Sequence, residues 1–159
     1  MTYPVGLDEI KQQYGDPAAY LRVDGGIHPS WERMLLDYVH LPEGLPLGWD
    51  RTIKVTRIRV HSTLVVPLEK IFSEIFNSGL WDRMETFDGS YAWRPSRGSQ
   101  KLSTHCWGIA LDFNAASNGL GEVGDMHPDI VKIFKEFGWT WGGEWGRPDP
   151  MHFQAASGY

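Results

Sequence analysis

Hydrophobic and polar residues recur at regular spacings in several stretches of the chain, and these spacings predict secondary structure. Residues 52–61 alternate β-branched with charged or polar side chains, which is typical of a strand with one buried face. Apolar residues in 66–76 recur every three or four positions and predict an amphipathic helix. The apolar positions of that helix are Leu68, Ile71, Phe72, Ile75 and Phe76.

Shorter patterns of the same kinds predict the remaining elements. We expect helices over residues 7–14 and 128–137, and strands over residues 90–94, 108–114 and 151–155. Helices and strands mixed in this order predict an α+β fold, in which a small antiparallel sheet is flanked by helices.

The chain has the length of one domain. Its 159 residues, of which 42% are hydrophobic, can bury a single core. Residues 25–50 are dense in proline and glycine, which predicts loops around one short apolar segment. We therefore expect residues 1–50 to form a loop-rich N-terminal arm that packs on a core of residues 51–159.

Composition excludes several classes of function and site. The formal net charge is −5, whereas a protein that neutralises nucleic-acid phosphates needs a basic surface. No stretch approaches the ~20 apolar residues of a membrane span, and the first residues lack the features of a signal peptide. We expect no nucleic-acid or membrane partner, and synthesis in the cytoplasm without a signal peptide. The single cysteine, Cys106, rules out an internal disulfide and a thiolate cluster for zinc.

A metal site in this chain must therefore use histidine and carboxylate ligands. His105 precedes the predicted strand 108–114, and Asp112 lies on that strand. In an extended strand Asp112 shares a face with Ala110 and Gly108, and these small residues leave open space around the carboxylate. A buried carboxylate needs a cation, hydrogen-bond donors or a metal ion, so Asp112 is the strongest single candidate.

A second candidate segment lies near the end of the sequence. His152 lies on the predicted strand 151–155 and points away from its apolar neighbours, so it can converge with His105 and Asp112. Two imidazoles and one carboxylate form a recognised catalytic zinc set that leaves the fourth tetrahedral position open. Asp149 is then free to be a general base. An isolated histidine on a strand is more often a hydrogen-bonded or exposed residue, and Asp149 alone is equally a turn residue.

Two motifs carry a resemblance to a known family. STHCWGIALDFN, residues 103–114, resembles the Ser-x-His-(x6)-Asp signature of the VanY-like zinc peptidases, which include D-alanyl-D-alanine carboxypeptidases, dipeptidases and L-alanyl-D-glutamate endopeptidases of peptidoglycan. DPMHF, residues 149–153, resembles their closing motif, an acidic residue three positions before a His-Phe pair. The resemblance covers residues 90–154, and two separated motifs in the right order make it specific. GLDEIKQQYGDP, residues 6–17, is similar to the opening of compact phage-type members.

The resemblance implies a hedgehog-type fold and one Zn²⁺ ion bound by His105, Asp112 and His152. It implies that Asp149 is the general base for a water activated by the ion. Glu144 is a rival for the base because flanking glycines leave it exposed, but its distance from the His-Phe pair does not match the family's motif.

The resemblance also implies residues that contact the substrate. YAWR, residues 91–94, is similar to the family's Tyr-x-x-Arg element, so Arg94 is the expected substrate-binding or oxyanion-stabilising arginine. Arg97 is the alternative. Either arginine is also explained simply as a surface cation with no role in binding. Ser103 matches a family position near the substrate, although it equally suits a hydrogen bond within its own loop.

The function implied is a zinc metallopeptidase that hydrolyses a peptide bond in the peptidoglycan stem peptide, with residues 51–159 as its catalytic core. It would be of the L-alanyl-D-glutamate endopeptidase or D-alanyl-D-alanine carboxypeptidase type. The alternatives are a non-catalytic, zinc-containing peptidoglycan-binding module and a zinc peptidase that acts on non-wall peptides. Without a signal peptide, the protein would reach the cell wall when released, as a phage endolysin is, or act on wall fragments in the cytoplasm. We expect a monomer.

Overall fold

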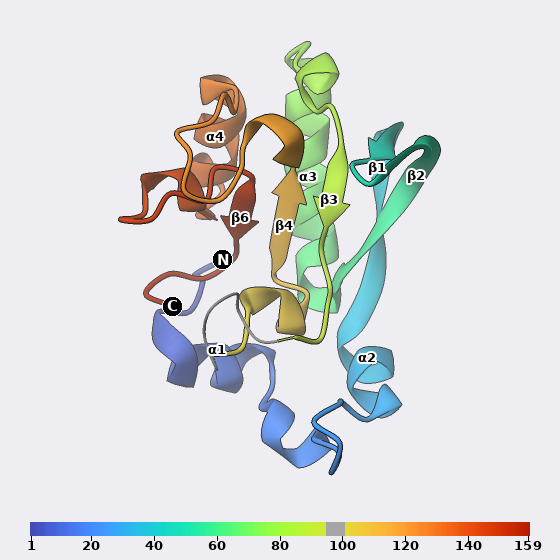
Figure 1. Ribbon diagram of the computed structural model, residues 1–159, viewed down its shortest axis with the longest axis vertical. Helices are drawn as coiled ribbons and strands as arrows, with labels where there is room; N and C mark the ends of the chain where they lie inside the picture. The colour runs from blue at the N-terminus through green and yellow to red at the C-terminus, as the bar shows by residue number, and fades with distance from the viewer. Residues whose placement is uncertain (95–100) are drawn as a thin grey trace.

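The protein has an open sheet with helices packed on it (Figure 1). The structure is a computed structural model that describes residues 1–94 and 101–159. Its α-helices are α1 (Gly6–Tyr14), α2 (Pro29–Leu35), α3 (Val65–Asn77) and α4 (Pro128–Glu136). Its strands are β1 (Leu36–Leu47), β2 (Asp50–His61), β3 (Phe87–Gly89), β4 (Ala110–Phe113), β5 (Thr140–Trp141) and β6 (His152–Gln154). The predicted α+β class is confirmed. None of the described helices has the length and apolar character needed to cross a bilayer.

The described strands form one sheet in the order β2-β1-β3-β4-β6-β5. Neighbouring strands are antiparallel except β1 and β3, which pair in parallel through Leu47 and Phe87. Between β2 and β3 the chain runs through α3 behind the sheet, so that β3 returns in the direction of β1 (Figure 1). The sheet is therefore mixed, whereas the sequence predicted an antiparallel one.

Residues 36–47 form the long strand β1, although their prolines and glycine predicted loops. The register between β1 and β2 shifts between His40 and Leu45, and this irregular stretch contains Pro42 and Gly44. Bulged positions accept residues that a regular ladder excludes. The two strands can therefore form a long hairpin despite these residues.

The strand predicted over residues 90–94 is wrong, because β3 ends at Gly89. The next residues hydrogen-bond to His105 in place of a neighbouring strand. The Ser90 carbonyl lies 2.7 Å from His105 Nδ1, and the Ala92 amide donates to the His105 carbonyl over 3.2 Å. This segment therefore supports His105 from the side of β3.

Helices α3 and α4 pack on the buried face of β4 and β6. Phe113 of β4 packs edge-on against Phe72 of α3, with ring centroids 6.2 Å apart. Phe153 of β6 stacks on Phe134 of α4 at 4.2 Å. Phe76, predicted on the apolar face of α3, is 42% exposed because it lies at the edge of that face. Side chains alternate along a strand, so the residue before each phenylalanine faces the opposite side of the sheet. These residues are Asp112 on β4 and His152 on β6.

The short 3₁₀ helix η4 (Thr104–Trp107) precedes β4 and is tied to the N-terminal segment. The Trp31 indole donates to the Cys106 carbonyl over 3.0 Å, and the Trp107 indole donates to the Gly15 carbonyl over 2.8 Å. Both indole rings are fully buried. The N-terminal segment therefore fixes the position of the turn that carries His105.

Gly108 ends η4 with a left-handed backbone, φ 68°. A Cβ atom at this position would lie 2.7 Å from Leu36 Cδ2 and 2.8 Å from the backbone nitrogen of His61. Gly108 is thus not extended and lies before β4. The prediction that it shares a strand face with Asp112 is wrong, because the turn into β4 needs a positive φ at this residue.

We expect Gly108→Ala to lower the free energy of unfolding by about 1–3 kcal/mol more than Gly79→Ala, because overpacking adds to strain that both substitutions share. Gly79 has a similar φ of 74°, but a Cβ atom there meets nothing within 4 Å. Urea unfolding of the two variants beside the wild type measures the difference. Equal losses of stability would show that the close approach at Gly108 is relaxed without cost.

Candidate metal centre

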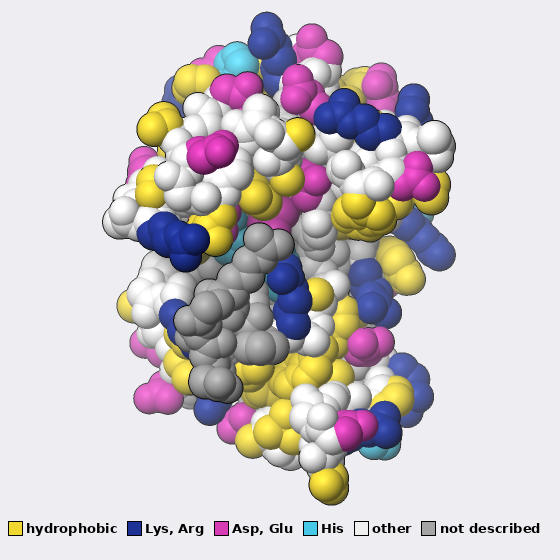
Figure 2. Space-filling model, in the orientation of Figure 1, with side chains coloured by type: hydrophobic (Ala, Val, Ile, Leu, Met, Phe, Trp, Pro, Cys, Tyr) yellow, Lys and Arg dark blue, Asp and Glu magenta, His cyan; other side chains and the backbone are white. Residues whose placement is uncertain are grey.

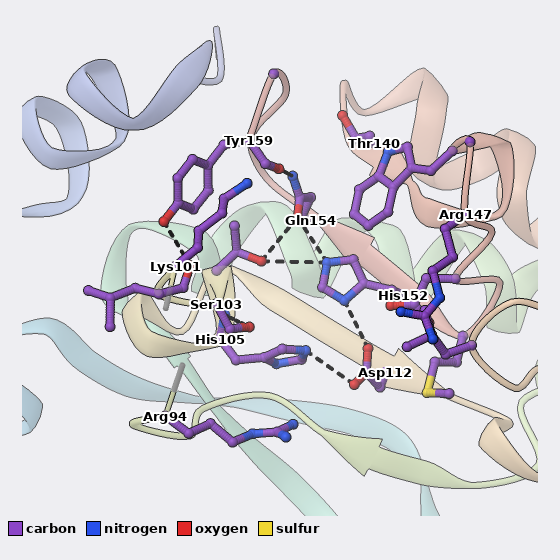
Figure 3. Close-up of a pocket in the computed structure, with 18 residues that line it drawn as sticks. Arg94, Lys101, Ser103, His105, Asp112, Thr140, Arg147, His152, Gln154 and Tyr159 are labelled. Carbon is purple, nitrogen blue, oxygen red and sulfur yellow. Dashed lines mark hydrogen bonds and ion pairs between the residues drawn. The ribbon is translucent and has the colours of Figure 1, made fainter. Parts of the chain in front are cut away.

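Three side chains from two strands and one turn meet on the face of the sheet opposite α3 and α4. Asp112 of β4 and His152 of β6 are direct partners in the antiparallel ladder, so their side chains lie on the same face. His105 reaches them from η4 (Figure 3). His105 Nε2 lies 3.1 Å from Asp112 Oδ2, and His152 Nδ1 lies 3.0 Å from Asp112 Oδ1.

These side chains could hold a metal ion, because one ligand atom from each lies within 4.8 Å of the others. Two imidazole nitrogens and a carboxylate oxygen are the donor set of catalytic zinc sites, in which a fourth position stays open. The sequence singled out the same residues, His105, Asp112 and His152, and the fold brings them together.

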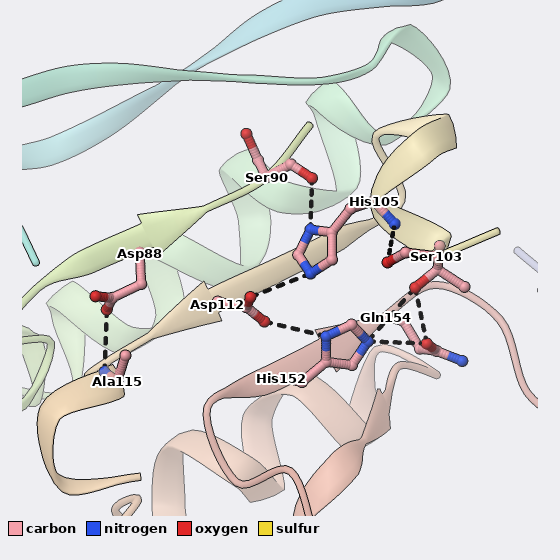
Figure 4. Close-up of polar contacts among 9 residues, drawn as sticks. Asp88, Ser90, Ser103, His105, Asp112, Ala115, His152 and Gln154 are labelled. Carbon is pink, nitrogen blue, oxygen red and sulfur yellow. Dashed lines mark hydrogen bonds and ion pairs between the residues drawn. The ribbon is translucent and has the colours of Figure 1, made fainter. Parts of the chain in front are cut away.

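The far nitrogen of each ring also has a partner (Figure 4). His105 Nδ1 lies 2.7 Å from the Ser90 carbonyl oxygen, which can only accept a hydrogen bond. A proton on Nδ1 leaves Nε2 as the nitrogen that faces Asp112, where it donates to the carboxylate when it is protonated and can bind a metal ion when it is not. His152 Nε2 lies 2.9 Å from Gln154 Oε1, so its Nδ1 is the nitrogen that faces Asp112. Such outer contacts orient metal-binding histidines.

The Asp112 side chain is 14% exposed and lies between two imidazoles that are 7% exposed. Burial alone would raise the pKa of the Asp112 carboxyl, but the charges and hydrogen bonds of His105 and His152 hold it far below its ordinary value. Burial alone would lower the pKa of His152, but the hydrogen bond and charge of Asp112 raise it. The carboxylate is therefore ionised, and in the metal-free protein it favours a proton on His152.

A pocket of about 700 Å³ opens onto these three side chains. Figure 2 shows that face of the molecule, where His and acidic side chains are visible in a hollow between Lys and Arg side chains. The described cationic residues that line it are Arg94, Lys101 and Arg147. The chain as a whole carries a net charge of −5, so this group of three cations contrasts with the acidic charge of the whole chain.

Asp149 lines this pocket and is half-buried. Its amide donates to the Gly142 carbonyl over 2.9 Å, and its carbonyl accepts from the His152 amide over 3.0 Å. Its negative charge adds to the effect of Asp112 in raising the pKa of His152. Glu144, the rival for the general base, is exposed and forms an ion pair with Lys135 at 2.6 Å. Among the described residues that line the pocket, Asp149 is present and Glu144 is not.

The residues expected near the substrate lie at the same opening. Arg94 lines the pocket with an exposed side chain, and its backbone is held by Cys106, whose Sγ donates to the Arg94 carbonyl over 3.0 Å. Ser103 also lines the pocket, and its hydroxyl oxygen accepts from the His105 amide over 3.2 Å, which caps η4. Arg97 lies outside the described residues.

Sequence reasoning did not identify several other residues of the site. Gln154 contacts His152, and its position two residues later on the same strand was a signal that could have found it. Thr104 lies 3.5 Å from His152 through its hydroxyl. Arg147 and Tyr159 line the pocket from irregular segments, where no hydrophobic period marks the direction of a side chain.

Comparison with protein families gives a match to part of the chain. A family model described as D-alanyl-D-alanine carboxypeptidase matches residues 97–155, a segment that contains His105, Asp112, Asp149 and His152. The resemblance that the two motifs indicated is confirmed over this segment, which carries the peptidase signature. No curated protein and no solved structure gives a significant match to the chain.

We expect Asp112→Asn to lower the pKa of His152 in the metal-free protein, because the substitution removes the negative charge that favours the imidazolium ion. In the wild type His152 should titrate above its ordinary value of 6.5. Histidine NMR signals followed against pH measure both values. His61 is the internal control, since burial lowers its pKa and Asp112 is not among the causes. A His152 pKa that is the same in the two proteins would contradict the described coupling.

Proposed function

We propose that this protein is a zinc-dependent peptidase that hydrolyses a peptide bond of the peptidoglycan stem peptide. The observation that carries the proposal is the convergence of His105 Nε2, Asp112 and His152 Nδ1 at a pocket, within the segment that matches the carboxypeptidase family. Two bond types suit the family resemblance, the L-alanyl-D-glutamate bond and the terminal D-alanyl-D-alanine bond.

The residues fit a zinc ion on the chemistry of their donors. The far nitrogens of both rings face acceptors, so the near nitrogens can both offer lone pairs, and the carboxylate supplies a negative charge. Bound there, zinc would supply Lewis-acid chemistry by acidifying water and polarising the carbonyl of the scissile bond. Its ligands would be His105, Asp112 and His152.

Asp149 is proposed as the general base. A carboxylate beside the pocket can take a proton from the attacking water and then pass it to the nitrogen of the leaving amine. The proton balance closes, because one carboxylate accepts the proton and releases it to the amine. Support comes from the place of Asp149 in the pocket wall and from its charge, which acts on His152.

Arg94 is proposed to bind the substrate carboxylate or the oxyanion that develops at the scissile carbonyl. A guanidinium suits either task, since its donors match two oxygens at once. Lys101 and Arg147 extend the positive charge of the same pocket. An anionic peptide is therefore favoured over a neutral or cationic one, which agrees with the free carboxylates of stem peptides.

The central experiment is mass spectrometry of purified peptidoglycan digested with the zinc-loaded protein. Loss of a terminal D-alanine or cleavage between L-alanine and D-glutamate is the expected result, and it identifies the bond. Asp149→Asn should keep the zinc and lower kcat by roughly 10²–10⁴-fold, the usual contribution of a general base. Glu144→Gln is the matched control and should keep wild-type activity.

Two outcomes would contradict the proposal. If zinc binds but no wall peptide is cleaved, the chain is a binding module or acts on other peptides. If Asp149→Asn keeps wild-type turnover, another group is the base. Metal analysis of His105→Ala and His152→Ala, which should each lose zinc, keeps the metal site and the base separate in this test.

We expect Arg94→Ala to lower kcat/KM by roughly 10–150-fold, the equivalent of losing one charge-assisted hydrogen bond of about 1.5–3 kcal/mol. A rise in KM alone would place the arginine on the substrate carboxylate, and a fall in kcat would place it on the oxyanion. Arg51→Ala on β2 is the control, because Arg51 is exposed and is not among the described pocket residues. Unchanged kinetics of Arg94→Ala would remove Arg94 from the site.

A further inference from the structure

Gln154 is a buried glutamine whose amide is fully engaged beside the metal centre. It is 1% exposed and lies two residues after His152 on β6, so both side chains are on the same face. Its Oε1 lies 3.0 Å from Thr104 Oγ1 and 2.9 Å from His152 Nε2. Its Nε2 donates to the carbonyls of Ala156 and Tyr159 over 3.2 and 3.1 Å.

The orientation of this amide follows from its partners. Two backbone carbonyls, of Ala156 and Tyr159, lie on one side, and carbonyl oxygens only accept hydrogen bonds. The NH₂ group must face them, because a flipped amide would place oxygen against oxygen at both contacts. Oε1 of Gln154 is therefore directed to His152.

The orientation of Gln154 in turn requires a proton on Nε2 of His152. Oε1 is an acceptor, so His152 Nε2 must donate to it. Thr104 agrees with this assignment, because its hydroxyl donates to Oε1 and leaves a lone pair toward Nε2 at 3.5 Å. Nδ1 faces Asp112 Oδ1 at 3.0 Å (Figure 4). In the metal-free protein a proton on Nδ1 donates to this carboxylate, and it is the proton that a metal ion would replace.

The two histidines of the centre turn opposite nitrogens toward Asp112. His105 is protonated on Nδ1 by its contact with the Ser90 carbonyl, and it offers Nε2. His152 is protonated on Nε2 and offers Nδ1. The first contact uses the backbone and cannot be removed by substitution, whereas the second depends on the side chain of Gln154.

We propose that Gln154 is a positioning residue that holds a proton on Nε2 of His152 and so presents Nδ1 to the metal ion. The inference deepens the proposed function in that it takes the ion at His105, Asp112 and His152 as given. It does not depend on which peptide bond is cleaved, or on cleavage at all. Thr104 supports Gln154 by occupying the second lone pair of Oε1.

Two variants separate positioning from a merely structural role. Gln154→Met has a similar shape but no acceptor, whereas Gln154→Glu keeps an acceptor toward His152. Both lose the amide donors to Ala156 and Tyr159, so both should lose stability in thermal unfolding without zinc. Only Gln154→Met should weaken zinc binding, by roughly 10–100-fold, as loss of an outer contact to a metal-binding histidine does. Competition with a chromophoric chelator measures the affinity.

The proton on Nε2 is read by NMR of the zinc-loaded protein. The Nε2–H signal of His152 should be protected from exchange with solvent in the wild type and in Gln154→Glu. In Gln154→Met it should exchange faster, because its acceptor is removed. Gln12→Met, on the exposed side of α1, is the matched control and should match the wild type in proton exchange and zinc affinity.

Three results would overturn the inference. One is the lack of a protected Nε2–H signal of His152 in the zinc-loaded wild type, which decides the matter even if Gln154→Met does not fold. The others are an unchanged zinc affinity in Gln154→Met, and an equal loss in both variants, which would make the role structural. If the wild type binds zinc but cleaves no wall peptide, the proposed function fails while the proton-exchange and affinity results still test Gln154.

Discussion

The structure around the site depends on one buried carboxylate held between two imidazoles. Asp112 is nearly enclosed, and a buried carboxylate without partners is costly. Its partners are supplied by the β4–β6 ladder, in which Asp112 lies opposite His152, and by the turn that carries His105. A slip of one residue in this register would turn Asp112 into the core and Leu111 toward the pocket.

The packing on the other face of the sheet holds this register. Phe113 and Phe153 lie next to Asp112 and His152 in sequence and are buried against α3 and α4. Apolar burial therefore holds the strands from behind, while the site occupies their open side. On that open side, hydrogen bonds from outer residues orient the side chains of His105 and His152.

Charge is distributed unevenly over the molecule. The chain is acidic as a whole, yet the described pocket residues include Arg94, Lys101 and Arg147. The expectation of no nucleic-acid partner rests on net charge, a property of the whole surface. Net charge does not predict the charges in the pocket, where these three cations line the same opening as Asp112 and Asp149. Recognition of an anionic peptide is thus compatible with an acidic protein.

The sequence alone determined the α+β class, the helices α1, α3 and α4, the strand β2 and the ligand candidates, because each depends on a local period or a short motif. Only the tertiary structure decided the rest. The parallel β1–β3 pair, the strand over residues 36–47 and the left-handed Gly108 depend on contacts between distant segments. The partners of the far nitrogens of the two histidines likewise require the Ser90 carbonyl and Gln154 to be placed beside them. Asp112 was identifiable because a carboxylate among apolar strand residues needs polar partners when it is buried. In the fold, His105 and His152 are those partners.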